Sequence, residues 1–151
     1  MTSRRHLTTA VALGATAVVV LSGCSSAVEI EPASQATSGV CREVTSVWPA
    51  KVGGNARRDV SDASAGAAYG DPAIIARCGV PALAPTTEDC IEVDGMGWVA
   101  EKLSDGTRFT TFGRDPALEV LIPSDYAPEP LLLPAFTKAA EKLPKNSLAC
   151  S

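Results

Sequence analysis

The chain has 151 residues, of which 46% are hydrophobic, and carries a formal net charge of -4. Removing residues 1–23, which we expect to be a signal peptide, leaves 11 basic against 17 acidic residues and a net charge of -6. An acidic chain without clustered Lys and Arg argues against nucleic-acid binding. The single histidine, His6, lies in the same segment, so a mechanism that needs a histidine base or ligand is excluded in the mature chain.

The first residues have the parts of a secretory signal peptide. Arg4 and Arg5 precede an apolar run over residues 7–21, which is shorter than the roughly 20 residues that a membrane-spanning helix requires. Leu21-Ser22-Gly23-Cys24 resembles the bacterial lipobox, in which the cysteine receives a diacylglyceryl group and becomes the new N-terminus. We therefore expect Cys24 to anchor the protein to the cell membrane on its extracytoplasmic side. An ordinary secreted protein, and export by the twin-arginine route, remain open alternatives.

Four cysteines follow Cys24, and an even number in an exported chain predicts two disulfides. Their wide spacing, with no C-x-x-C pair and no histidine, argues against a zinc site. Each bridge would stabilise the fold by roughly 3 to 4 kcal/mol. The three connectivities that four cysteines allow stay open. We favour Cys41 with Cys78 and Cys90 with Cys150, because the first pair would tie the opening helix to a neighbouring strand.

Residues 24–38 are rich in Ser, Ala, Thr and Gln and contain no aromatic residue, so we expect a flexible tether. From Val40 to Val47, apolar residues recur at helical intervals. Thr37 or Ser38 would cap this helix. The pattern places Cys41 on its buried face.

Short apolar stretches separated by Gly, Pro and Asp turns predict antiparallel strands in the rest of the chain. A last helix is expected where apolar residues of 132–143 fall on one face, with Pro134 in its first turn. The sequence thus predicts an α+β domain over 39–151: an antiparallel meander sheet packed by an N-terminal and a C-terminal helix. The expected strands are 67–69, 74–78, 90–93, 98–103, 108–112 and 117–122.

Four residues are candidates for a binding site. Trp98, among glycines, would offer a stacking platform if it were exposed, although a core position is the commoner role. Arg57 and Arg58 would receive an anionic ligand, or else belong to a solvated loop. Asp71 lies in the turn Gly70-Asp71-Pro72, which is one of the most distinctive sequence motifs of the chain.

The other polar motifs favour solvated turns. Glu88-Asp89 and the pair Glu92 and Asp94 lack the spacing of a calcium loop. Arg114 is expected to face water in a hairpin turn. No serine-nucleophile or phosphate-binding motif occurs, so we expect no metal and no cofactor.

Several landmarks together resemble the small actinobacterial lipoproteins of Domain of Unknown Function family 3515. The resemblance covers about residues 40–126 and implies location and fold, but no activity and no catalytic residue. The landmarks are the lipobox, Cys41 with Trp48-Pro49, Arg57-Arg58, Tyr69-Gly70-Asp71-Pro72, Arg77-Cys78-Gly79-Val80, Gly95 with Trp98, Phe109 to Arg114, and Leu118-Glu119-Val120.

The sequence favours a non-enzymatic envelope lipoprotein that binds an envelope protein or a cell-wall component. The alternative is a hydrolase or transferase that works without histidine and uses paired carboxylates. Two acidic side chains that converge in one cleft would favour that alternative.

Overall fold

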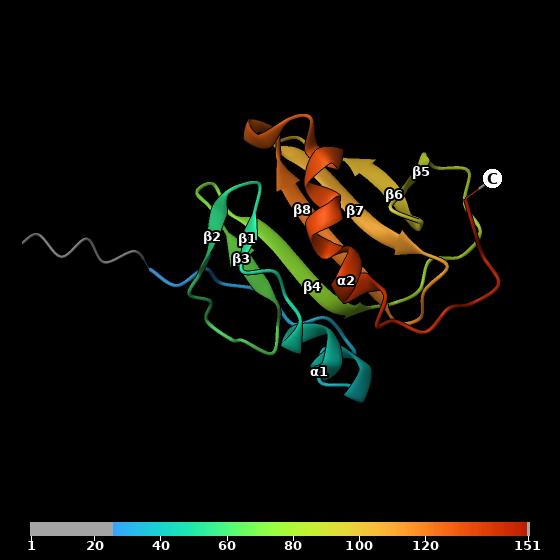
Figure 1. The fold of residues 1–151 in the computed structure, drawn as a ribbon, viewed down its shortest axis with the longest axis horizontal. Coiled ribbons are helices and arrows are strands. Elements are labelled where there is room, and N and C mark those ends of the chain that lie inside the picture. Colours follow the sequence, from blue (N-terminus) through green and yellow to red (C-terminus); the bar gives the residue numbers. More distant parts are fainter. Residues whose placement is uncertain (1–25, 151) are drawn as a thin grey trace, which may run out of the picture.

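The computed structural model describes residues 26–150 as one antiparallel sheet with helices against it (Figure 1). Eight strands lie in the order β1-β2-β3-β4-β8-β7-β6-β5. The expected α+β class with an antiparallel sheet is confirmed. The strands are β1 Lys51–Val52, β2 Asn55–Arg58, β3 Ala67–Tyr69, β4 Ile74–Val80, β5 Cys90–Val93, β6 Met96–Lys102, β7 Gly106–Phe112 and β8 Ala117–Pro123.

The sheet consists of two hairpin runs, β1 to β4 and β5 to β8, which pair through β4 and β8. In that central pair Arg77 lies opposite Glu119 and Cys78 opposite Leu118. The expected meander therefore holds within each run. Between the runs, the connection over residues 81–89 carries the chain from β4 to the far edge of the sheet.

The first helix, α1 (Gly39–Ser46), forms as expected. The Ser38 hydroxyl caps it by accepting a hydrogen bond of 3.2 Å from the backbone amide of Cys41. Cys41 and Val44 are fully buried. The helical spacing thus directs Cys41 into the core, where it meets β4.

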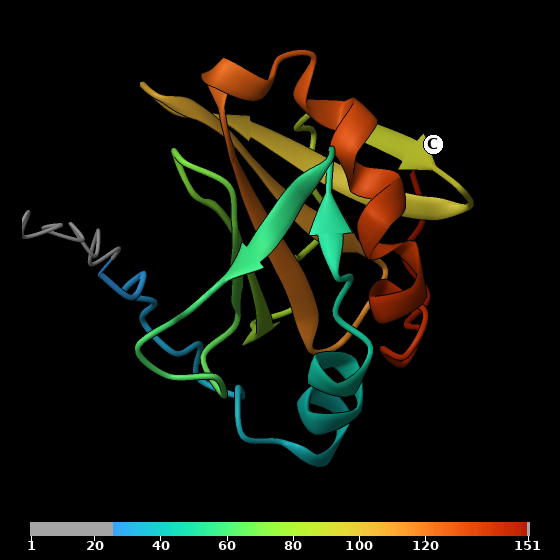
Figure 2. The same ribbon diagram turned by 60° about the vertical axis from the view of Figure 1, so that its left-hand side comes forward.

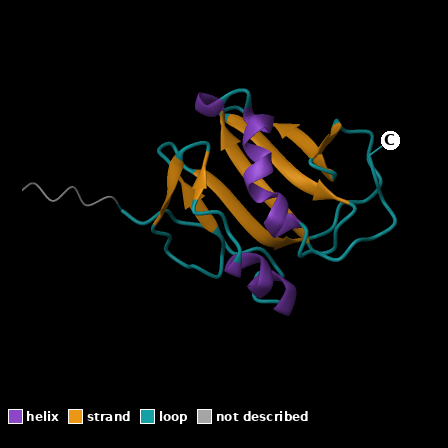
Figure 3. Ribbon diagram, in the orientation of Figure 1, coloured by secondary structure: helices purple, strands orange, loops and turns teal. Residues whose placement is uncertain are grey.

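The C-terminal helical segment crosses one face of the sheet (Figure 3), but only its second part is α-helical. It comprises the 3-10 helices η1 (Ser124–Tyr126) and η2 (Glu129–Phe136), followed by α2 (Thr137–Ala140). The expected α-helix over 132–143 is thus shorter. Pro134 lies inside η2 and lacks the amide that an α-helical turn would use.

The main core lies between this segment, α1 and the inner face of the sheet. Phe136 is its centre, and the rings of Trp48 and Tyr69 meet it edge-on at centroid distances of 6.3 and 6.0 Å. These buried aromatic contacts hold the helices in place. The largest fully buried side chains are Trp98, Tyr69, Phe109, Phe136, Ile74, Leu118, Ile122, Leu133, Leu143, Val44, Val52 and Val120.

The segment expected to be a flexible tether is packed against the sheet from Val28 onward. Val28 forms a parallel bridge with Val60. Its amide donates to the Asp59 carbonyl, and its carbonyl accepts from the Ser61 amide, both at 2.9 Å. Ile30 is 5% exposed and belongs to a small second core. The prediction of a flexible tether was therefore wrong for this part. A few buried apolar side chains and backbone hydrogen bonds are enough to dock a segment whose average composition is polar.

Gly79 allows the same N-terminal segment to approach β4 closely. Its φ of +99° is a conformation that favours glycine, and a Cβ there would meet the backbone of Gln35. The Gln35 amide donates to the Gly79 carbonyl at 3.0 Å. A glycine at this position is therefore a condition for docking the segment.

Both favoured disulfides are present. Cys41–Cys78 joins α1 to β4, and Cys90–Cys150 joins β5 to the end of the described chain, each with a Cα–Cα distance of 5.5 Å. The predicted pairing is thus confirmed.

Two expectations concern residues that the structure does not describe. The signal peptide over 1–23 and the anchor at Cys24 both lie outside residues 26–150. Within that range, no helix combines the length and the apolar character that crossing a membrane demands.

Candidate functional site

A row of charged side chains crosses the face of the sheet that points away from η2 and α2. Successive side chains of a strand point to opposite faces. Leu118 and Val120 enter the main core, so Glu119 between them points outward. Neighbouring strands place Arg77 (β4) and Arg108 (β7) beside it.

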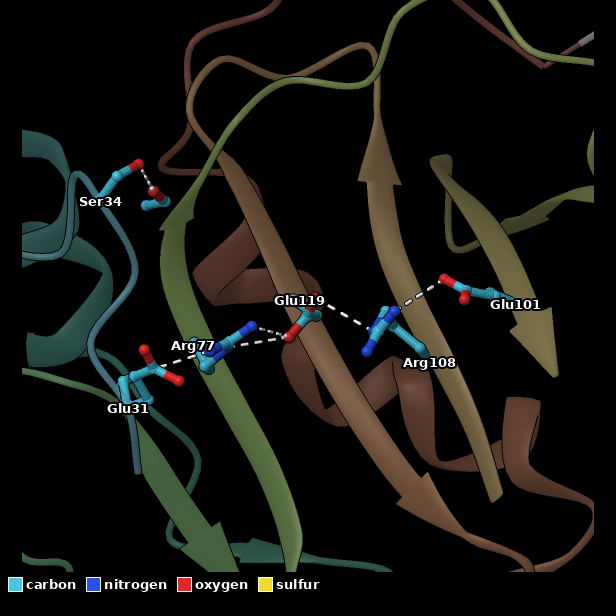
Figure 4. A network of polar contacts seen from close by, with 7 residues as sticks. Glu31, Ser34, Arg77, Glu101, Arg108 and Glu119 are labelled. Carbon is cyan, nitrogen blue, oxygen red and sulfur yellow. Dashed lines mark hydrogen bonds and ion pairs between the residues drawn. The ribbon is translucent and has the colours of Figure 1, made fainter. Parts of the chain in front are cut away.

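Glu119 is the centre of this row, which we call the outer-face network (Figure 4). Arg77 donates from Nε to Glu119 Oε1 at 2.8 Å, and its Nη2 lies 2.7 Å from the same oxygen. Arg108 Nε lies 3.4 Å from Glu119 Oε2, and Arg108 Nη1 donates to Glu101 Oε2 at 2.8 Å. Two guanidinium groups thus balance two carboxylates.

The burial of Glu119 makes this network different from ordinary surface ion pairs. Glu119 is only 6% exposed, so its charge depends on the two arginines for compensation. The Glu101 side chain is 57% exposed and Arg108 34%. The network therefore passes from a buried centre to an accessible end at Glu101.

The N-terminal segment closes the other end of the network. Arg77 Nη1 donates to the Glu31 carbonyl at 3.2 Å, and the Ser34 hydroxyl donates to the Gly79 carbonyl at 3.4 Å (Figure 4). The guanidinium of Arg77 thereby links the docked segment to Glu119.

A groove lies at the accessible end, between the connection over 81–89 and strands β6 and β7. We call it the loop groove; its volume is about 470 Å³. An adjoining hollow of about 450 Å³ shares Thr86 and Glu88 with it. Carboxylates and apolar surface together suit a ligand that carries both basic and apolar groups. The groove is lined by Leu83, Ala84, Pro85, Thr86, Glu88, Val99, Glu101 and Thr110.

Trp98 does not serve as an exposed platform. The side chain is fully buried in the main core, where it lies opposite Thr111 on β7. The binding hypothesis for Trp98 was therefore wrong, and the core interpretation is confirmed. The alternation of β6 accounts for this, because Met96, Trp98 and Ala100 face the helices.

The structure brings Arg58 and Asp71 together, but away from the loop groove. Arg58 Nη1 donates to the Gly70 carbonyl at 3.0 Å and lies 3.5 Å from Asp71 Oδ1. The Asp71 side chain is 91% exposed. Arg57 and Arg58 lie in strand β2, not in the expected loop, and Arg57 is exposed opposite Tyr69. This geometry points to Arg58 as a brace for the β3–β4 turn.

Arg114 is buried, contrary to the expectation that it faces water. It is 7% exposed and donates from Nη1 to the Leu143 carbonyl at 2.6 Å. Burial lowers the pKa of Arg114, while Glu141 opposes that effect. Exposure was expected because the residues around Arg114 are typical of a turn. The local sequence gives no sign that the C-terminal part of the chain covers this turn.

The acidic motifs are separated in space. Glu88 lines the loop groove, whereas Asp94 accepts a hydrogen bond of 3.4 Å from the Thr137 hydroxyl. No group of three metal-ligating side chains occurs within residues 26–150. Two carboxylates do meet in the outer-face network, since Glu101 and Glu119 share Arg108, but each is ion-paired there.

The family model described as "Protein of unknown function (DUF3515)" matches residues 6–147. The chain belongs to the DUF3515 family. No curated protein and no solved structure matches it.

The outer-face network of this DUF3515 chain was missed as a site by sequence reasoning. Arg77 and Glu119 both lie in stretches that carry the family resemblance, but their partnership was not visible in either stretch alone. A charge at an outward position of an otherwise apolar strand was the available signal. Their pairing depends on the contact between β4 and β8, which are far apart in the sequence.

Proposed function

We propose that this protein is a lipid-anchored, non-enzymatic binding or accessory protein on the outer face of the cytoplasmic membrane. The pair of disulfides carries the proposal. They use four of the five cysteines, and Cys24, in the lipobox-like motif, is the fifth. Disulfides of this kind persist in oxidising compartments, and an unpaired cysteine after a signal peptide suits lipidation.

Binding is favoured over catalysis by the state of the carboxylates. Glu119 accepts from Arg77 and faces Arg108, while Glu101 accepts from Arg108. A general acid or base must exchange a proton with its substrate, and an ion-paired carboxylate is poorly suited to this role. Such a network instead fixes the positions of the side chains beside the loop groove.

The partner we propose is an envelope protein or a cell-wall component that reaches the loop groove. Glu88 favours basic groups on that partner, and Leu83 and Pro85 favour apolar contact. Shape and charge at this groove, rather than at Trp98 or Arg57, then determine recognition.

The anchor is tested by replacing Cys24. Cys24→Ala should abolish incorporation of labelled lipid and release the protein from the membrane fraction, whereas Ser26→Ala should leave both unchanged. Lipid labelling of Cys24→Ala would refute the anchor.

The groove is tested by in-cell photocrosslinking. A photoreactive residue at Thr86 should capture a discrete envelope partner, and one at exposed Glu43 on α1 should not. If both positions gave the same products, the groove would not be the binding surface. Turnover of a wall fragment that Glu101→Gln abolishes would favour the hydrolase alternative instead.

A further inference from the structure

The connection between Cys24 and the folded domain is short. Residues docked on the sheet begin at Val28, which is hydrogen-bonded on both sides to residues 59 and 61. An extended chain spans at most about 3.6 Å per residue. The Cα atom of Cys24 therefore lies within roughly 14 Å of that of Val28, whatever the conformation between them.

The docked residue lies at one end of the sheet. Val28 pairs with Val60, directly after β2, and the chain enters beside β2 and β3, whereas β5 and the C-terminal end lie at the opposite end of the long axis (Figure 1). The view turned by 60° shows the same separation (Figure 2). Five strand spacings separate β2 from β6, which amounts to about 24 Å along the sheet.

We infer that the end of the domain formed by β2, β3 and residues 59–64 rests on the bilayer surface, with the loop groove turned away from it. The inference rests on the proposed lipid anchor. An anchor whose connection reaches roughly 14 Å cannot leave that end far above the headgroups. The groove on β6 and β7 is then displayed toward the space outside the membrane.

The charges at the membrane end indicate that connection length, not lipid charge, sets this orientation. Lys51 and Arg57 are exposed there, but so are Glu29, Asp59 and Asp62. Such a mixed surface neither requires nor strongly repels anionic lipids. This end of the domain therefore faces the bilayer whether the lipid headgroups are zwitterionic or anionic.

The test measures the distance of two reporters from the headgroups in the full-length lipidated protein. A fluorescent residue is placed at Ala63, near the anchored end, or at Thr87, beside the groove; both positions are exposed. Each protein is reconstituted in phosphatidylcholine vesicles that contain a headgroup nitroxide quencher. Quenching at 63 should exceed quenching at 87 at least threefold, and replacing a third of the lipid by phosphatidylglycerol should not change the ratio.

A matched control lengthens the connection. Ten Gly and Ser residues inserted between Ser26 and Ala27 should bring the two quenching values together. Equal quenching at 63 and 87 without the insertion would overturn the inference, as would a ratio that appears only with anionic lipid.

Intact mass separates this inference from the proposed function. A diacylglyceryl mass on Cys24 with equal quenching refutes the orientation alone. Without lipid on Cys24 the proposed anchor falls, and the orientation is then tested by coupling the Cys24 thiol to a maleimide lipid. Strong quenching at 63 in that sample supports the geometry, and equal quenching overturns it.

Discussion

The hydroxyl of Tyr69 offers the sharpest test of the core. The side chain is fully buried, and no hydrogen-bond acceptor among residues 26–150 reaches its oxygen. A buried hydroxyl without a partner costs about 1 to 3 kcal/mol. Tyr69→Phe removes that oxygen and keeps the ring against Phe136, so the variant should be at least as stable as the wild type.

The advantage of Tyr69→Phe should grow at high pH. Burial raises the pKa of Tyr69 from 10.0 to about 12, and the charge of Arg57 opposes this only in part. A folded-state pKa above the unfolded one means that the stability is intact below pH 10 and is lost as the pH rises toward 12. Two pKa units correspond to about 3 kcal/mol, which the wild type should lose and the variant should keep.

Thermal unfolding followed by circular dichroism measures this difference. Near pH 7 the Tm of Tyr69→Phe should equal or exceed that of the wild type by up to roughly 10 °C, and the gap should widen by pH 11. Tyr126→Phe is the matched control, because it removes a hydrogen bond of 2.7 Å to the Pro72 carbonyl. That control should lower the Tm slightly. A Tm of Tyr69→Phe clearly below the wild type, or an unchanging gap up to pH 11, would refute the reasoning.

Three further predictions concern buried charge, close backbone approach and acid stability. Glu119→Ala leaves Arg77 without a carboxylate partner and Arg108 with Glu101 alone, and should lower the free energy of unfolding in urea by about 3 kcal/mol, whereas exposed Glu101→Ala should cost less than about 1 kcal/mol. Gly79→Ala should loosen the N-terminal segment, with a loss of about 2 kcal/mol and new protease cleavage within residues 26–37. Gly54→Ala shares a positive φ but meets no atom, so it should cost less and leave that segment protected. Hydrogen bonds from its own amide, then from Thr107 and Lys102, lower the pKa of Glu129 although burial opposes them. Glu129→Gln should therefore cost about 1 kcal/mol at pH 7, and this cost should shrink as the pH falls below 4.5 and through the lowered pKa.

Each of these three predictions would be contradicted by a specific result. Equal losses for the two glutamate variants would mean that burial does not distinguish them. An unchanged cleavage pattern in Gly79→Ala would show that the segment does not depend on this contact. A constant difference for Glu129→Gln from pH 7 to pH 3.5 would exclude the proposed role of its ionised form.

Strands β3 to β8 were predictable because turn residues mark their ends, whereas β1 and β2 were not expected. Gly95, Ser104-Asp105 and the stretch from Gly113 to Pro116 separate the strands β5, β6, β7 and β8 from one another. The pairing of β4 with β8 was not predictable in this way, since neither strand carries a local signal that selects a partner far along the chain. The same limit applied to Arg77 and Glu119, which meet only through that pairing.

The N-terminal segment shows where average composition fails. Ile30 and Ala36 are apolar residues in a mostly polar stretch, and both are buried. Backbone hydrogen bonds to residues 59, 61 and 79 complete the docking, and such bonds leave no trace in the side-chain pattern. Trp98, by contrast, could be assigned to the core, because a large aromatic side chain in an alternating strand is usually buried.

The two disulfides also determine how the domain would respond to mechanical tension between its ends. Cys41–Cys78 and Cys90–Cys150 enclose residues 42–77 and 91–149 in covalent loops. A pull on the N-terminal end would first load the hydrogen bonds of Val28 to residues 59 and 61. Once these bonds are broken, the force would pass from α1 to β4 through the first bridge, without loading β1, β2 or β3. Even after complete unfolding, only residues 26–41 and 78–90 would lengthen. Under tension between its two ends the domain would thus yield by a short extension and keep most of its chain together for refolding.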